Sequence, residues 1–134
     1  MNLHTLVGDR AGHRCEYCHA TELVFNFPFE VEHIIPIYRG GDSSESNFAL
    51  ACRSCNLRKG TRITGTDAEF SRAVRLFNPR QDQWAGHFQV DIASGKVIGI
   101  TITSIGRATI ACLEVNSPTQ LAARQLWIQL NLFP

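Results

Sequence analysis

Two Cys-x-x-Cys pairs constrain this chain more than any other feature of its sequence. The first knuckle is Cys15–Cys18 and the second knuckle is Cys52–Cys55. Four thiolates complete the tetrahedral coordination of one Zn²⁺ ion. A structural zinc site contributes directly to folding and can hold together segments that are too short to be stable alone. The sequence therefore predicts a structural zinc site that joins the two knuckles.

The composition is that of a globular domain. The chain has 134 residues, of which 44% are hydrophobic, so its size predicts one domain. No apolar run is long enough to span a membrane, and residues 1–14 do not resemble a signal peptide. We therefore expect a cytoplasmic protein, in which closely spaced cysteines bind metal rather than form disulfides. The fifth cysteine, Cys112, has no neighbour at this spacing and is interpreted as a small buried hydrophobic residue.

Polar residues of a particular kind lie between and just after the knuckles. Glu32, His33 and Asn47 lie between them, and Asn56 directly follows Cys55. Taken alone, His33 is typical of a structural histidine, Asn47 of a turn and Asn56 of a helix cap. Together they offer an imidazole, a carboxylate and two amides, which are groups that can cut a phosphodiester with the help of one divalent metal.

The charge is unevenly distributed, although the net charge is only +1. Residues 1–50 hold three basic and seven acidic side chains, whereas residues 51–80 hold seven basic and two acidic ones. Basic residues beside a metal site can hold a phosphate backbone, and an ordinary solvated helix face is the alternative. The candidates for phosphate contacts are Arg39, Arg53, Arg58, Lys59 and Arg62.

Local patterns predict the order of the secondary structure. We expect a short helix or arm within 1–14, strands at 27–37 and 48–51 joined by a polar loop, and a helix at 53–59. The capping-box pattern Thr66-Asp67-Ala68-Glu69 predicts a helix at about 67–77. Strands at 87–93 and 96–103, a helix at 107–115 and a final helix after Ser117-Pro118 complete the prediction.

These residues resemble the HNH endonuclease family, also called the ββα-metal nucleases. The resemblance covers residues 13–60 and rests on both knuckles, Glu32-His33-Ile34-Ile35-Pro36, Gly40-Gly41, Asn47, Asn56 and Lys59-Gly60. It implies an α+β fold, in which a small zinc-stapled ββα-metal core is followed by a C-terminal β-hairpin and helices. The core is expected at residues 1–65, with residues 66–134 packed on it as one unit.

The resemblance also implies roles for the candidate residues. His33 matches the general base, and Asn47 matches the residue that orients it. Glu32 and Asn56 match ligands of a catalytic divalent metal, and their hard oxygen atoms suit Mg²⁺ or Mn²⁺. The implied activity is metal-dependent hydrolysis of DNA phosphodiester bonds, which leaves 5′-phosphate and 3′-hydroxyl ends.

Two other functions remain open on the sequence. One is a zinc-binding nucleic-acid-binding module without catalysis, and the other is a zinc-stapled interaction protein. The intact candidate site argues against the first, and the basic segment 51–80 argues against the second. Cutting of both strands would favour a homodimer, for which the apolar C-terminal helix is the hypothetical interface.

Overall fold

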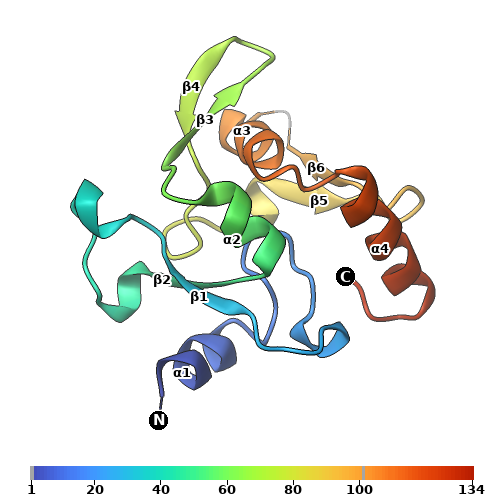
Figure 1. Cartoon of the computed structure of the whole chain (residues 1–134). Coiled ribbons are helices and arrows are strands. Elements are labelled where there is room, and N and C mark those ends of the chain that lie inside the picture. Colours follow the sequence, from blue (N-terminus) through green and yellow to red (C-terminus); the bar gives the residue numbers. More distant parts are fainter. Residues whose placement is uncertain (1, 101) are drawn as a thin grey trace.

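The chain folds into short helices and small antiparallel sheets, so the predicted α+β class is confirmed. The computed structural model describes residues 2–100 and 102–134, and within them it contains four α-helices and three two-stranded sheets (Figure 1). The helices are α1 (Leu3–Arg10), α2 (Arg53–Lys59), α3 (Ser104–Leu113) and α4 (Pro118–Gln129). The strands are β1 (Glu30–His33), β2 (Phe48–Ala51), β3 (Thr64–Asp67), β4 (Arg72–Arg75), β5 (Phe88–Val90) and β6 (Val97–Gly99).

The first sheet and α2 position the candidate site. Strands β1 and β2 pair antiparallel, with Glu32 opposite Ala49 and His33 opposite Phe48. All four residues of β2 are buried. The Cys52 sulfur caps α2 by accepting a hydrogen bond from the Cys55 amide, and α2 ends before Gly60, whose φ is positive. The second knuckle thus forms the first turn of α2, and the predicted strand–loop–strand–helix order is observed.

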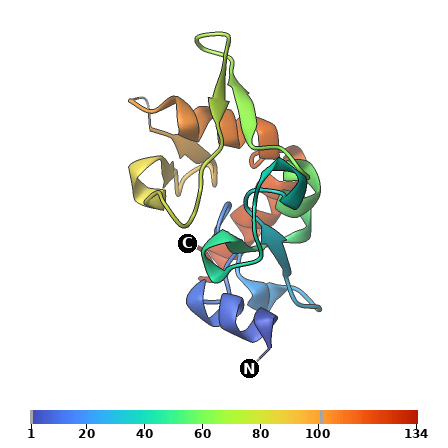
Figure 2. The same ribbon diagram turned by 90° about the vertical axis from the view of Figure 1, so that its left-hand side faces the viewer.

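The helix predicted at 67–77 is wrong, because this segment forms the β3–β4 hairpin. Asp67 pairs with Arg72 across the hairpin, which projects from the rest of the molecule (Figure 2). The Asp67 carboxylate does accept a hydrogen bond from the Glu69 amide, as in a capping box, but that bond closes the turn. Arg107 of α3 binds the same carboxylate at 2.9 Å and keeps it buried. A tertiary ion pair therefore overrides the local helix pattern.

The other expected elements are present with shifted ends. The hairpin predicted around Ser94-Gly95 is formed by β5 and β6, and both C-terminal helices occur. Helix α3 begins at Ser104, earlier than predicted, because the Thr103 hydroxyl accepts a hydrogen bond from the Ile105 amide. The predictions for residues 1 and 101 lie outside the described residues.

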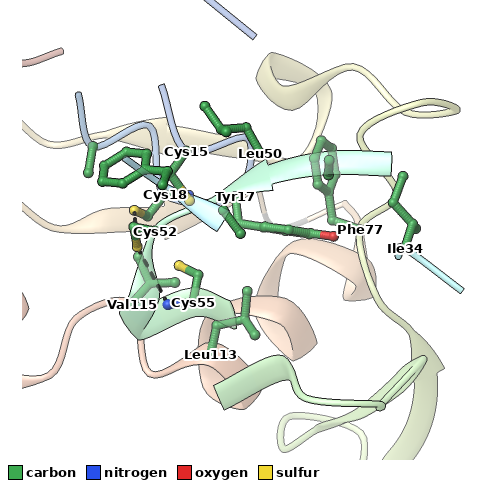
Figure 3. Packing of buried hydrophobic residues seen from close by; sticks show 14 of the residues in the cluster. Cys15, Tyr17, Cys18, Ile34, Leu50, Cys52, Cys55, Phe77, Leu113 and Val115 are labelled. Atoms are coloured by element: carbon green, nitrogen blue, oxygen red, sulfur yellow. Dashed lines mark hydrogen bonds between the residues drawn. The ribbon is translucent and has the colours of Figure 1, made fainter. Parts of the chain in front are cut away.

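One buried cluster contains side chains from both halves of the sequence. The four knuckle cysteines and Leu50 pack in the same cluster as Phe77, Phe88, Leu113 and Val115 (Figure 3). Helix α3 also contacts both α2 and β3. The segments before and after residue 65 therefore share a hydrophobic core. Within the described part of the chain, no helix is long and apolar enough to span a membrane.

Candidate functional site

The four knuckle cysteines form a compact buried cluster. Their sulfur atoms all lie within 4.8 Å of one another, and none of these cysteines forms a disulfide. The Cys18 and Cys52 sulfurs are 3.8 Å apart. A tetrahedral zinc site with Zn–S bonds of about 2.3 Å requires sulfur–sulfur distances of about 3.8 Å. The four-cysteine cluster therefore fits a structural zinc ion, as the sequence predicts.

The thiols of this cluster influence one another strongly. Hydrogen bonds from Cys15, Cys18 and Cys55 hold the pKa of Cys52 well below its usual value. Hydrogen bonding within the cluster raises the pKa values of Cys18 and Cys55. The cluster thus stabilises a thiolate at Cys52, and the thiolate is the form of cysteine that binds metal.

A buried guanidinium lies close to the cluster. Arg124 of α4 is 0% exposed and donates to the Gly95 and Val115 carbonyls, at 3.1 and 2.8 Å. Val115 belongs to the same buried cluster as the four knuckle cysteines (Figure 3). Burial lowers the pKa of Arg124, and the charges of all four cysteines oppose this effect. The positive charge of Arg124 thus partly balances the negative charge of the thiolates.

A separate pocket brings together three of the four predicted catalytic and metal-binding residues. This front pocket has a volume of about 500 Å³ and lies between the end of β1, the following loop and α2. Strand β1 ends at His33, so neighbouring residues that would point to opposite faces of a longer strand can both line one pocket. Its lining residues are Val31, Glu32, His33, Pro36, Ile37, Tyr38, Asn56, Gly60 and Thr61.

Glu32 forms part of a buried polar network. Its carboxylate accepts hydrogen bonds from the Tyr17 hydroxyl and, at 3.1 Å, from the Lys59 ammonium group. Burial raises the pKa of Glu32, and the charge of Lys59 acts in the opposite direction. Burial also raises the pKa of Tyr17 well above its usual value, so Tyr17 remains a donor. The two donors fix the carboxylate at the edge of the front pocket.

Asn56 is oriented by a residue that the sequence analysis missed. Its amide nitrogen donates to the Glu30 carboxylate, which also binds Arg53 at 3.2 Å. Because the nitrogen is engaged with Glu30, the carbonyl oxygen of Asn56 remains as the donor atom for a cation. Period-two alternation along β1 places Glu30 and Glu32 on the same face. This alternation could have identified Glu30 from the sequence as a further residue of the candidate site.

His33 contacts the loop that follows β1. Its Nε2 atom lies 3.1 Å from the Ser43 hydroxyl, and its ring packs against Phe48 at 4.9 Å between centroids. Among the described residues Nδ1 has no hydrogen-bond partner, so this nitrogen can accept a proton in the tautomer whose Nε2–H donates to Ser43. No sequence pattern pointed to Ser43, since only the fold of the loop brings it to the imidazole.

Asn47 does not contact the ring of His33, which it was expected to orient, through a hydrogen bond. Its side-chain amide bonds the Ile35 amide and carbonyl, both at 2.9 Å, and the Asp42 carbonyl at 2.8 Å, instead of the His33 ring. These bonds fasten the two ends of the loop after β1. A Cβ atom at Gly41 would lie 1.8 Å from the Ile35 oxygen, so this close approach requires glycine. Asn47 can therefore position His33 only through the backbone.

The predicted phosphate contacts differ in their exposure. Lys59 is a correction, because it is 1% exposed and its ammonium binds Glu32 and the Ile34 carbonyl, inside the protein. Arg58 is held by Glu114 at 3.2 Å. Arg53 and Arg62 are exposed, and Arg39 is exposed with its side chain donating to the Thr61 carbonyl beside the front pocket.

Comparison with protein families agrees with this geometry. The family model described as HNH endonuclease matches residues 15–62, a segment that contains both knuckles, β1, β2 and α2. Residues 15–62 are thus similar to the HNH endonuclease family, and the predicted resemblance is confirmed over this segment. Neither a curated protein nor a solved structure matches the chain significantly. An HNH domain with a zinc site indicates a nuclease or a related nucleic-acid function.

Proposed function

We propose that this protein is a metal-dependent DNA endonuclease with its active site in the front pocket. The observation that carries the proposal is the meeting of Glu32, His33 and Asn56 around one pocket of about 500 Å³. The Glu32 carboxylate and the Asn56 carbonyl are hard oxygen ligands and fit Mg²⁺ or Mn²⁺. When bound, such an ion would stabilise negative charge on the leaving 3′-oxygen.

The residues of the chain have separate roles in the proposed hydrolysis. In the tautomer whose Nε2–H donates to the Ser43 hydroxyl, His33 accepts a proton at Nδ1 from the attacking water. Tyr17 and Lys59 hold the Glu32 carboxylate in place. Arg39 is placed at the rim to bind a DNA phosphate, and the exposed Arg53 and Arg62 extend the basic surface.

Cutting of supercoiled plasmid tests the proposal directly. We expect nicking with Mg²⁺ or Mn²⁺ and none in their absence, with an intact zinc site in both cases. His33→Ala should lower the rate at least about 100-fold, because a general base contributes a factor of about 10² to 10⁴. His4→Ala, outside the front pocket, is the matched control. Equal activity of His33→Ala and wild-type protein would refute the role of His33.

One observation favours a second candidate, a nucleic-acid-binding module without catalysis. Both carboxylate oxygens of Glu32 already accept hydrogen bonds, one from Tyr17 and one from Lys59. If the front pocket serves only for binding, His33→Ala should weaken DNA binding, and no metal should support cutting. Branched and single-stranded DNA should be tried as substrates before that conclusion is drawn.

We also propose that residues 1–65 and 66–134 fold as one unit in the cytoplasm. The shared buried cluster supports this, since an isolated 1–65 fragment would expose the core faces that contact Phe77 and Leu113. We expect that fragment to show little helical signal in circular dichroism, even with excess zinc. A cooperatively folded fragment would refute the single unit.

A homodimer is the proposed assembly for cutting both strands. Leu126 of α4 and Leu130, which caps the C-terminal end of this helix, are more than half exposed and supply an apolar surface. Light scattering that detects only monomer over a wide concentration range would exclude this assembly.

A further inference from the structure

A second pocket lies beside the edge of β2 that does not pair with β1. This rear pocket has a volume of about 350 Å³, and its lining includes Arg10, Arg14, Glu16, His19, Arg80 and Trp84. Strand β2 pairs with β1 along one edge, whereas its other edge bonds Glu16 and Arg10. The rear pocket and the front pocket share no lining residue.

The rear pocket holds more positive charge than its carboxylates balance. Arg10 donates to the Glu45 and Phe48 carbonyls at 2.8 and 2.7 Å, and Arg14 donates to the His19 carbonyl at 3.0 Å. All of these acceptors are uncharged. Within residues 2–100 and 102–134 neither of these two guanidinium groups has a carboxylate partner. Each also keeps N–H donors that are free to bind a ligand.

The carboxylates that line the rear pocket are already engaged. Glu16 binds Arg80 and also accepts a hydrogen bond from the Leu50 amide at 2.9 Å. Asp82 binds Arg75 through two hydrogen bonds, at 2.7 and 2.8 Å. Neither carboxylate forms an ion pair with Arg10 or Arg14, so an anion that enters the pocket meets two guanidinium groups that have no carboxylate partner within the described residues.

The positive groups also repel one another. Burial and the nearby charge of Arg10 together lower the pKa of Arg80 to about 10. Keeping like charges together in a partly enclosed space is unfavourable unless an anion binds between them. Guanidinium groups bind phosphate through paired hydrogen bonds, which makes phosphate the best match in chemistry.

The pocket wall is rigid and large enough for more than a single ion. The rings of His19 and Trp84 are stacked with centroids 3.9 Å apart, and the Trp84 indole donates to the Tyr17 carbonyl at 2.8 Å. A volume of about 350 Å³ lies within the range of about 300–1,000 Å³ found for small-ligand sites. The pocket therefore has space for a phosphate together with its attached sugar.

We propose that the rear pocket binds a backbone phosphate of DNA, at a contact point separate from the front pocket. The phosphate chemistry follows from Arg10 and Arg14, whereas the choice of DNA as its source rests on the proposed function.

The salt dependence of DNA binding tests this contact. Binding of a labelled duplex is measured by fluorescence anisotropy over a range of salt concentrations without Mg²⁺, in a His33→Ala background that prevents cutting. Each lost phosphate contact should reduce the slope of log affinity against log salt by about 0.9. We expect this reduction for Arg14→Gln and for Arg10→Gln. Lys96→Gln, which removes an exposed charge on the β5–β6 hairpin, is the control and should keep the slope of the parent protein.

The outcomes separate this proposal from the nuclease proposal. An unchanged slope in Arg14→Gln, with the zinc content and melting temperature of the parent protein, would overturn the rear contact. Arg14 is the decisive variant because Arg10 also supports the loop at Glu45. If excess phosphate raises the melting temperature above that in chloride of equal ionic strength while the DNA slope stays unchanged, the ligand is a free phosphate compound and the DNA contact is overturned. A reduced slope in a protein that cuts no plasmid would support the rear contact and refute the endonuclease.

Discussion

Replacement of Arg124 by methionine tests how α4 is coupled to the zinc site. Methionine has a similar length but removes the charge and three hydrogen bonds, which Arg124 donates to the Gly95 and Val115 carbonyls and, at 3.2 Å, to the Asn116 side chain. A hydrogen bond from a charged group contributes about 1.5–3 kcal/mol, and relief of the buried charge offsets part of the loss. We therefore expect the free energy of unfolding to fall by about 3–5 kcal/mol.

This loss is a large part of the total stability, which is about 5–15 kcal/mol for a typical domain. Urea unfolding followed by tryptophan fluorescence measures it, because Trp127 lies on α4 and packs against Phe133 and Phe25. Arg53→Met is the control, since the Arg53 side chain is 60% exposed and its ion pair with Glu30 should contribute less than about 1 kcal/mol.

Zinc retention separates the effect of charge from that of packing. Four thiolates outweigh the charge of one Zn²⁺ ion, so the site stays negative and gains from the nearby Arg124 cation. We expect Arg124→Met to lose zinc to a coloured chelator at lower chelator concentration than Arg124→Lys, which keeps the charge. Equal zinc retention in the two variants would refute the electrostatic coupling, and a stability loss below about 1 kcal/mol would refute the packing argument.

Three further predictions concern the loop, the pH dependence and the metal. Gly41→Ala should reduce plasmid cutting about 100-fold with zinc retained, because the new Cβ atom would displace the Ile35 carbonyl and shift His33. Cutting at the wild-type rate would contradict this prediction. Arg75 lowers the pKa of Asp82 from its ordinary 3.8, so the ion pair stabilises the fold above that pH, and this stabilisation is lost as the pH falls through the lowered pKa. In an acid titration, Asp82→Asn should therefore show a flatter profile of stability against pH than the wild-type protein. An identical profile would argue against the pair. Cys55→Ser should bind no zinc by metal analysis and should remain largely unfolded, since a structural zinc contributes on the order of 10 kcal/mol; a native circular dichroism spectrum would disprove that dependence.

The sequence was sufficient wherever the information is local. Ligand spacing in the knuckles predicts the zinc cluster, because two Cys-x-x-Cys pairs supply the four thiolates that complete a tetrahedral zinc site. The short strand at 48–51 and the helix at 53–59 follow from apolar runs and from a glycine stop. The residue types around His33 indicated a candidate hydrolytic site by themselves.

Only the tertiary structure decided where the partners of these residues lie. Helix propensity favoured a helix after Thr66, but the buried ion pair from Arg107 to Asp67 stabilises a hairpin there. Lysine is usually a surface residue, yet the packing of α2 on β1 buries Lys59 beside Glu32. In the same way, Glu30 contacts Asn56, and Arg124 contacts Gly95 and Val115, only because separate elements pack together in the fold. The sequence thus determined which chemical groups are present and how they are spaced along the chain. Long-range packing determined which charges lie beside one another, because a buried charge is stable only next to a partner, and sequence distance does not reveal that partner.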